Sequence, residues 1–456
     1  MPSITTLSDD LLYYIAELLE HDRPTLYALC LVSRRFCCAA QGLLFRHAGD
    51  VDHKKFHLVS RSLSEKPDLS RHVHSFRIAL DEGQLDEENL KHVLAFPNIR
   101  ALTFRRVDTP KRINARGMEA LKERFLLLRQ GREVERDFEC GFLDMYALKG
   151  IRTIQLQVDF TSSEILRFML VPGLQSLCAE YIGILWEPHI HTIPTQTKSS
   201  LTKLSILGGG VWQCSPSTLQ CLLSFCSSLK HLRCKIPMYT SIDPMEPQKS
   251  SVSCSVRPWQ LTNTFKHVHN TLVTLSLLNM RHSVPYDGSV MDLSEFKVLR
   301  DLEITSCCIM PPGPPCAERN SLAGRLPATL RRLKLEFPRE TGIFYHHGEG
   351  DAFLNQDPAN IPETRYYWIS QLLYHKPMHV PDLVSIDMTD PPGRIGYYFW
   401  KNEPWAMPPD IADLSKAMEV QLSVHISYPR PGSNMDIWNE RGCKPRWLVE
   451  EYNYSY

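Results

Sequence analysis

The first 48 residues carry apolar side chains at helical spacing. Ser8 can cap a first helix, and Asp9 and Asp10 would fall in its opening turn, where negative charge is favourable. The apolar residues that follow are too many for the single stripe of a surface helix. They are Leu11, Leu12, Ile15, Leu18 and Leu19, with Tyr13 and Tyr14 between them. The pattern predicts one apolar face turned inward and a second face free for another contact.

Two further helices are expected in the same stretch. Asp22 and Pro24 open the second, because proline is tolerated in the first turn of a helix and not in its interior. The third begins at about Ser33. The apolar positions are Leu26, Leu29 and Val32 in the second helix, and Phe36, Leu43, Leu44 and Phe45 in the third.

About 40 residues of helix bury too little surface to be stable alone without a metal, a disulfide or a partner. No metal-ligand spacing occurs in this stretch, so a partner is the expected remedy. The alternative is an ordinary helical cap on the chain that follows.

Beyond Pro67 one pattern recurs, apolar-x-x-apolar-x-apolar, usually after a Pro, Ser or Asn turn. The first members of neighbouring instances are mostly 23–31 residues apart, which is the repeat interval of a leucine-rich solenoid. The instances are Val73/Phe76/Ile78, Ile99/Leu102/Phe104, Ile151/Ile154/Leu156, Leu174/Leu177/Ala179, Leu201/Leu204/Ile206, Leu229/Leu232/Cys234, Leu272/Leu275/Leu277, Leu299/Leu302/Ile304, Leu330/Leu333/Leu335 and Leu383/Ile386/Met388.

The repeat has a simple physical interpretation. Its last two apolar positions alternate with polar ones, so they lie on one face of a short strand. The intervening residues return the chain to the next parallel strand, usually through a helix, as expected at Ser163–Leu170, Ser217–Phe225 and Thr364–His375. Because one unit cannot cover its own apolar face, stacked units form one continuous core. We expect an α/β fold with a parallel sheet.

The repeats resemble the leucine-rich repeat family loosely. That family places Asn or Cys three residues after the last strand leucine, and here the match occurs once, as Cys307. Elsewhere this position holds Val107, Asp159, Gly209, Pro237 or Pro338. We therefore expect an irregular solenoid without an asparagine ladder; chance alignment in a leucine-rich chain is the alternative.

These patterns divide the chain into four parts. They are a helical module at residues 1–50, a linker helix at 51–68, the solenoid at 69–390 and an aromatic- and proline-rich cap at 391–456. Long insertions are expected at 107–150, with a helix over Gly117–Arg129, and at 237–257 and 337–362. The cap would protect the open end of the solenoid.

Aromatic residues of the C-terminal third fill the core or form a recognition surface, and we favour the core. They are Tyr366, Tyr367, Trp368, Tyr397, Tyr398, Phe399, Trp400 and Trp405.

Charge and composition do not favour any particular class of binding partner. Lys+Arg and Asp+Glu are both 51, so nothing favours nucleic acid or an anionic membrane. No apolar run approaches the roughly 18 residues of a membrane span, and no signal peptide is recognisable. The 14 cysteines are then expected to be reduced thiols of a cytoplasmic or nuclear protein, packed mostly as small apolar side chains.

Catalytic and metal-binding patterns are weak. The Gly208–Gly210 run lacks the Lys-Ser/Thr of a phosphate loop and is expected to be a turn. His53 and His57 have i, i+4 spacing without the acidic residue of a zinc protease, and no CxxC occurs. No serine-hydrolase or kinase pattern is present. We expect a protein that is not an enzyme and that has no cofactor or metal.

Residues 7–48 resemble an F-box. The order and spacing of the apolar positions match, as does the run Val32-Ser33-Arg34-Arg35-Phe36, although Ser8 replaces the proline that usually follows the first leucine. An F-box followed by leucine-rich-repeat-like units resembles the substrate-receptor subunit of a Skp–cullin–F-box ubiquitin ligase. This resemblance implies that the helices dock on a Skp-type linker, and through it on a cullin, while the repeats present a protein target. Such a receptor acts by proximity and not by chemistry.

The residues expected to contact the linker are apolar, and some of them must instead hold the three helices together. They are Leu7, Leu11, Leu12, Ile15, Leu19, Leu29, Val32, Phe36, Leu44 and Phe45. Target contacts are expected on the strand faces and long loops. The runner-up is a repeat scaffold without a ubiquitin role, whose first helices are an end cap. A hydrolase with an atypical site is a weaker third reading.

Overall fold

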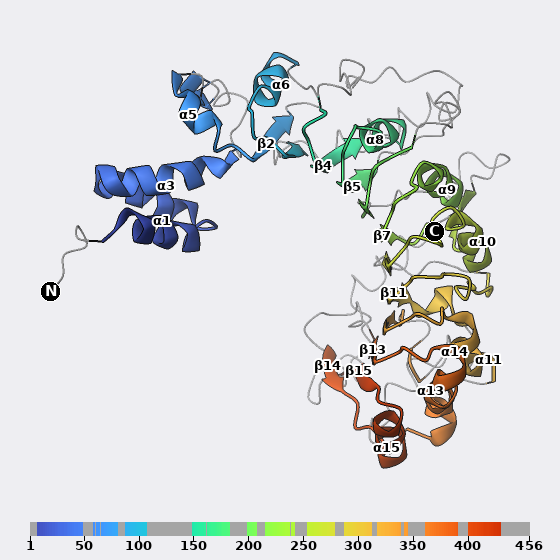
Figure 1. Ribbon diagram of the computed structural model, residues 1–456. Helices are drawn as coiled ribbons and strands as arrows, with labels where there is room; N and C mark the ends of the chain where they lie inside the picture. Colours follow the sequence, from blue (N-terminus) through green and yellow to red (C-terminus); the bar gives the residue numbers. More distant parts are fainter. Residues whose placement is uncertain are drawn as a thin grey trace, which may run out of the picture. The chain divides into compact units, whose positions relative to one another are not determined.

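The computed structural model divides the chain into two compact units, Met1–Gly183 with Ser199–Leu201, and Ile184–Lys198 with Thr202–Tyr456. It describes residues 7–48, 58–59, 61–63, 65–80, 87–106, 148–160, 162–182, 198–207, 215–237, 239–241, 253–278, 287–311, 317–338, 342–344, 361–390 and 400–429. Each unit contains parallel strands with helices on one side of the sheet (Figure 1).

The first unit opens with the helices expected from the apolar spacing. They are α1 (Asp9–Leu18), α2 (Arg23–Val32) and α3 (Arg34–Arg46). A side chain caps each N-terminus: the backbone N–H of Leu11 donates to Ser8, that of Thr25 to Asp22, and that of Phe36 to Ser33. The short polar residues in the sequence therefore set where each helix begins.

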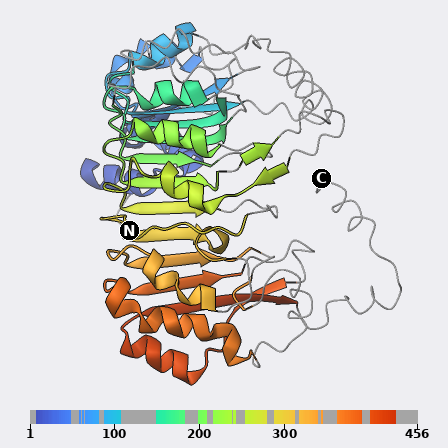
Figure 2. The same cartoon turned by 90° about the vertical axis from the view of Figure 1, so that its right-hand side faces the viewer.

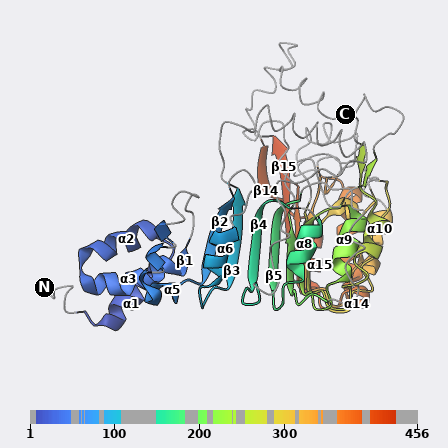
Figure 3. The ribbon, with the colours of Figure 1, turned by 90° about the horizontal axis from the view of Figure 1, so that it is seen from above.

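Five parallel strands complete the first unit, and they follow one another in chain order. They are β1 (His47–Ala48), β2 (Ser75–Leu80), β3 (Ala101–Arg106), β4 (Thr153–Phe160) and β5 (Ser176–Ile182). The helices between them are α5 (Pro67–Ser70), α6 (Glu87–Leu94) and α8 (Ser162–Met169) (Figure 3).

The second unit continues the same construction. Its parallel strands are β6 (Lys203–Ile206), β7 (His231–Lys235), β10 (Thr274–Leu278), β11 (Asp301–Thr305), β12 (Arg332–Glu336), β13 (Ser385–Thr389) and β15 (Gln421–Pro429). β14 (Trp400–Pro404) runs antiparallel to β15 at the edge, and β8 (Tyr239–Ser241) pairs with β9 (Ser253–Ser255) separately.

Helices connect these strands, and Figure 2 shows them in front of the stacked strands. They are α9 (Pro216–Ser224), α10 (Pro258–Thr264), α11 (Ala317–Asn320), α13 (Glu363–Tyr374), α14 (Lys376–His379) and α15 (Pro409–Ala417), with 3₁₀ turns at Ser306–Cys308 and Leu322–Arg325. The expected return helices coincide with α8, α9 and α13 to within one residue. The expected helix over Gly117–Arg129 lies outside the described residues.

Every residue of the ten apolar triplets is buried. Their strand positions stand in register, as in Phe76↔Leu102 in the first unit and Leu232↔Leu275 in the second. The expectation of an α/β, repeat-like solenoid with a parallel sheet is therefore confirmed. The stack also continues past residue 390, because Leu422 of β15 stands opposite Ile386 of β13.

Backbone hydrogen bonds join the residues that enter successive strands. The N–H of Arg100 donates to the carbonyl of His74 at 2.8 Å, and the N–H of Arg152 donates to that of Arg100 at 2.6 Å. In the second unit the N–H of Val273 donates to Lys230 at 2.8 Å, and that of Arg300 to Val273 at 2.8 Å. These hydrogen bonds extend the parallel pairing by one residue beyond the N-terminal ends of the strands.

Candidate protein-binding surfaces

The three N-terminal helices enclose a small core of their own. Its central side chains come from all three helices, which is why each helix is needed to close it. They are Leu12, Ala16, Leu26, Phe36, Ala39 and Ala40, with Leu7, Leu19, Leu29, Cys30, Leu43 and Leu44 partly buried around them. At its edge Arg35 of α3 donates through Nε and a terminal nitrogen to Asp9, at 3.0 and 2.7 Å, and so ties α3 to the start of α1.

The other side of α1 is apolar as well. Leu11, Tyr14 and Leu18 are three and four residues apart, so they share one stripe, and Leu18 is 70% exposed. α2 carries a comparable set of Tyr27, Leu31 (71% exposed) and Val32 (63% exposed). Scattered exposed apolar residues are normal, but several gathered on one small module indicate a binding surface. We call these two sets the apolar faces of α1 and α2.

The ten residues expected at the linker divide into three groups. Leu12 and Phe36 belong to the core, so the structure assigns them to packing inside the module. Leu11 and Val32 are exposed. The partly buried ones are Leu7, Ile15, Leu19, Leu29, Leu44 and Phe45. Whether any of them contacts a partner stays a prediction.

Four exposed residues of the apolar faces were missing from that set: Tyr14, Leu18, Tyr27 and Leu31. The signal was present in the sequence, because Leu11, Tyr14 and Leu18 follow the i, i+3, i+7 spacing of a helix face. Leu12 and Ala16 define the opposite, inward face at the same spacing.

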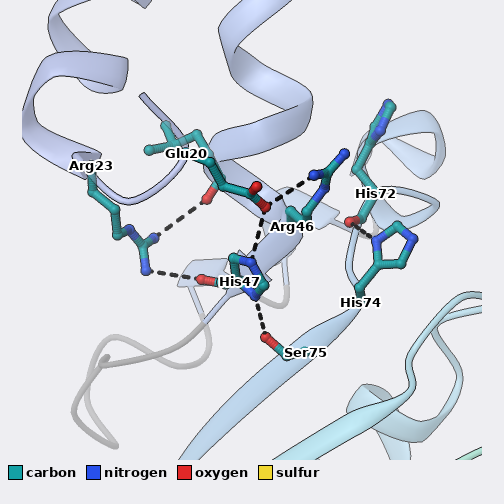
Figure 4. A network of polar contacts seen from close by, with 8 residues as sticks. Glu20, Arg23, Arg46, His47, His72, His74 and Ser75 are labelled. Atoms are coloured by element: carbon teal, nitrogen blue, oxygen red, sulfur yellow. Dashed lines mark hydrogen bonds and ion pairs between the residues drawn. The ribbon is translucent and has the colours of Figure 1, made fainter. Parts of the chain in front are cut away.

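A polar network connects this module to the first repeat strands. α3 runs directly into β1, and His47 of β1 stands opposite Ser75 of β2. One oxygen of Glu20 accepts from Arg46 at 3.0 Å and contacts Nε2 of His47 at 3.1 Å, while Nδ1 of His47 lies 2.8 Å from the Ser75 hydroxyl (Figure 4). The hydrogen bond from Arg46 holds the pKa of Glu20 below its usual value. The helices are thus hydrogen-bonded to the sheet at this joint.

The strand residues between the buried ones form a second surface, the sheet face opposite the helices, which we call the open face. In the second unit, opposite charges on neighbouring strands pair across β11 and β12. Lys334 contacts Glu303 at 2.6 Å, and Arg332 pairs with Asp301. Burial acts to raise the pKa of Glu303, but hydrogen bonds from Lys334 and Ser276 outweigh it and lower that pKa.

On β6 and β7 the open face has a different character. Lys203, His231 and Arg233 are exposed there. Within the part of the chain that the structure describes, neither Lys203 nor Arg233 makes an ion pair. Nδ1 of His231 lies 2.9 Å from the Thr274 hydroxyl. The positive charge of Arg233 acts to lower the pKa of both Glu303 and Glu336, so carboxylates of β11 and β12 interact with it electrostatically.

The described residues contain no group of three or more metal-ligating side chains. His53, His57 and the Gly208–Gly210 run lie outside them.

Burial raises the pKa of the Cys226 and Cys234 thiols to about 12, as expected for cysteines that pack as apolar side chains. Among the described residues, every helix is too short or too polar to cross a membrane.

The aromatic residues of the C-terminal third are mainly in the core where the structure describes them. Tyr366, Trp368 and Trp405 are buried, and the rings of Tyr366 and Trp405 lie 5.5 Å apart. Tyr367 is exposed. Tyr397, Tyr398 and Phe399 lie outside the described residues, as does the side chain of Trp400.

Comparison with known proteins finds little. No family model matches the sequence, and no match was found among curated proteins. Among solved structures, the chain is similar to one in the crystal structure of the Rad7 and Elc1 complex in yeast, with a TM-score of 0.29, 10% identity, and coverage of 85% of this chain and 81% of that chain. A similarity at this level assigns neither a fold nor a function.

Proposed function

We propose that this protein is the substrate-receptor subunit of a Skp–cullin–F-box ubiquitin ligase. In this role α1–α3 dock on a Skp-type linker, which connects to a cullin, and the repeats hold a protein target in the cytoplasm or nucleus. The chain would perform no chemistry itself. It would raise the effective concentration of a target lysine near the ubiquitin-loaded enzyme.

The apolar faces of α1 and α2 carry this proposal. A three-helix module that has already closed its own core still leaves Leu18, Leu31 and Val32 largely exposed. Burying such leucines at an interface contributes roughly 1.5–3 kcal/mol each, which favours a partner over solvent. The F-box resemblance of residues 7–48 supplies the identity of that partner.

The joint at Glu20 suits the same role. A receptor must hold its target at a fixed distance from the linker, since proximity is lost when the geometry varies. Hydrogen bonds from Arg46 and His47 to Glu20, together with the pairing of β1 with β2, couple the linker-binding helices to the first repeat strands.

The test is capture of a purified Skp-type linker by the full chain. The double variant Leu18→Asp, Leu31→Asp should weaken capture by roughly a hundredfold or more, because these two side chains are the most exposed of the apolar faces. Replacing Leu12 would not test the proposal, since that residue closes the core. Met378→Asp is the matched control, because Met378 is equally exposed but lies on α14.

Both variants should keep the circular dichroism spectrum of the wild type. Undiminished capture by the Leu18, Leu31 variant would refute the proposal.

A repeat scaffold without a ubiquitin role is the second candidate. It is favoured by β1, which extends the sheet at β2 and so makes the helices resemble an end cap. A receptor should bring down linker and cullin in equal amounts from cells, whereas a scaffold should bring down neither.

A further inference from the structure

We propose that one edge of the sheet in the second unit binds the phosphodiester backbone of nucleic acid. It is the edge at which β7, β10, β11 and β12 begin, and it is formed by residues 225–230, 266–273, 297–300 and 326–331, which lead into these strands. We call it the basic edge. The inference goes beyond the receptor role proposed above and does not depend on it.

The basic edge carries cations and no carboxylate. Its four segments, all of which the structure describes, contain no Asp or Glu, and the next strand along the sheet brings the first acidic residue, Asp382 before β13. The whole chain has a formal net charge of zero, so the charge of this edge is a local property. The exposed basic residues are Lys230, Lys266, Lys297, Arg300 and Arg331, and the same segments contain His267 and His269.

Backbone hydrogen bonds place these residues side by side. The N–H of Arg331 donates to the carbonyl of Arg300, and that of Arg300 donates to Val273, both at 2.8 Å. The N–H of Val273 donates in turn to Lys230 at 2.8 Å. Neighbouring strands are about 4.8 Å apart, so the row from Lys230 to Arg331 crosses roughly 14 Å of the edge. Residues that are far apart in the sequence thus form one line of positive charge.

The side chains of this row are not engaged by the rest of the described chain. Within it, Lys230, Arg300 and Arg331 make no ion pair and no side-chain hydrogen bond. The first unit, taken by itself, shows the opposite case. There Arg100 and Arg152 also precede strands, but each donates from Nη1 to a backbone carbonyl, at 2.9 and 3.0 Å. The cations of the second unit therefore keep their hydrogen-bond donors for another molecule.

The carboxylates of β11 are engaged on the open face instead. Asp301 pairs with Arg332, and Glu303 pairs with Lys334. Glu295, in the turn before β11, makes no ion pair with any described residue. Because like charges on neighbouring strands repel each other, an anion supplied by another molecule is the complementary partner of the basic edge.

The chemistry of the edge favours a phosphate backbone over an acidic protein. Protein interfaces are built around buried apolar and aromatic side chains. Of the large apolar side chains in the four described segments, only Val298 is exposed, at 37%. A phosphodiester chain is bound largely through Lys and Arg, and it presents a charge at every nucleotide, so it can follow a row that crosses several strands. Such contacts carry no sequence information, so binding should not depend on the base sequence.

The experiment measures binding of the full chain to a fluorescein-labelled DNA duplex by fluorescence anisotropy, as salt is raised from about 50 mM to about 200 mM. A second duplex of unrelated sequence and a peptide of alternating glutamate and serine are the comparison probes. We expect both duplexes to bind equally, the peptide to bind more weakly, and log Kd for the duplexes to rise linearly with the logarithm of the salt concentration.

Each phosphate contact contributes about 0.9 to the slope of that line. Arg300→Gln, Arg331→Gln should therefore lower the slope by about 1.8 and raise the Kd at low salt roughly tenfold. Lys297→Gln should lower the slope by about 0.9. Arg34→Gln, Lys416→Gln is the matched control, because it removes the same charge as the double variant from exposed positions on α3 and α15, and it should leave the slope unchanged.

Three results would overturn the inference. They are no binding of either duplex, an equal slope for the Arg300, Arg331 variant and its control, and displacement of the duplex by the glutamate peptide at equal charge, which would assign the edge to an acidic protein. Circular dichroism should show the wild-type spectrum for every variant. If the double variant is unfolded, the single variant decides, and an unchanged slope for Lys297→Gln then overturns the inference.

Discussion

A carboxylate oxygen of Glu20 and the Nε2 atom of His47 lie 3.1 Å apart, although 26 residues separate them in the sequence. Glu20 follows the end of α1, and His47 is the residue at which α3 gives way to β1. The same oxygen accepts a hydrogen bond from Arg46. One side chain therefore connects the turn between α1 and α2 to the end of α3, where the helices join the sheet.

Glu20→Gln should loosen this joint. Glutamine loses the charge that Arg46 stabilises, at a cost of under about 1 kcal/mol for a pair near the surface. Hydrogen exchange followed by mass spectrometry should show faster exchange in peptides that cover His47 and Ser75. Glu17→Gln, an exposed change on α1, is the control. Equal protection in both variants would contradict the role of Glu20.

Acid should have the same effect on the wild type. The pKa of Glu20 in the folded protein is below the ordinary 4.5, so its contribution is complete above pH 4.5 and is lost as pH falls through the lower folded value. Protection at His47 and Ser75 should decline in that range. The Glu20→Gln variant should not show this decline.

Truncation of Leu12 should lower the stability of the helical module, whereas truncation of Leu18 should weaken linker capture. Leu12→Ala leaves a cavity in the core and should destabilise the helical module by about 2–5 kcal/mol, whereas Leu18→Ala should change stability by less than about 0.5 kcal/mol. Urea dependence of hydrogen exchange in α1–α3 measures both. Leu18→Ala should weaken linker capture while leaving exchange unchanged. Equal destabilisation by the two changes would show that the module packs differently.

The repeats could be predicted because their signal is local and redundant. In Leu272/Leu275/Leu277, spacing alone identifies the strand and its buried face. All ten triplets are buried because each unit has to cover its apolar face against its neighbours. The helix starts were predictable for a similar reason, since Ser8, Asp22 and Ser33 are local capping signals.

The surfaces were harder to predict because they depend on how each helix is turned toward the core and on which residues of neighbouring strands stand opposite each other. Leu11 and Leu12 are adjacent and equally apolar; helical spacing places them on different faces of α1, and the packing of the three helices decides that the face of Leu12 is the buried one. Asp301 and Arg332 are 31 residues apart and become a pair only when β11 and β12 align.

Cysteine reactivity should follow burial. Cys38 is exposed, whereas Cys234 is fully buried and its thiol pKa is raised to about 12. At pH 8 a thiol of that pKa is ionised in about one molecule in 10⁴, and alkylation requires the thiolate. Mass spectrometry after brief iodoacetamide treatment should find Cys38 modified and Cys234 intact. In urea both should react. Modification of Cys234 at the rate of Cys38 under native conditions would place it outside the core.

Asp390 should make the second unit less stable as pH rises. It lies at the end of β13, accepts a hydrogen bond from the N–H of Ile343 at 3.1 Å, and is fully buried. Burial raises its pKa to about 7, and the Ile343 hydrogen bond and the charge of Arg319 offset only part of that effect. Between about pH 4 and pH 7 the folded state keeps a proton that the unfolded state releases, so unfolding becomes easier through that window.

Asp390→Asn removes the ionisation and keeps an oxygen that can accept from Ile343. The variant should therefore match the wild type near pH 4 and exceed its stability at pH 8, by on the order of 2–4 kcal/mol. Urea unfolding followed by tryptophan fluorescence across this range gives the difference. Asp382→Asn, an exposed change just before the same strand, should leave the wild-type slope in place. A wild type that is no less stable at pH 7 than at pH 4.5, relative to Asp390→Asn, would mean that Asp390 is already ionised in the folded protein.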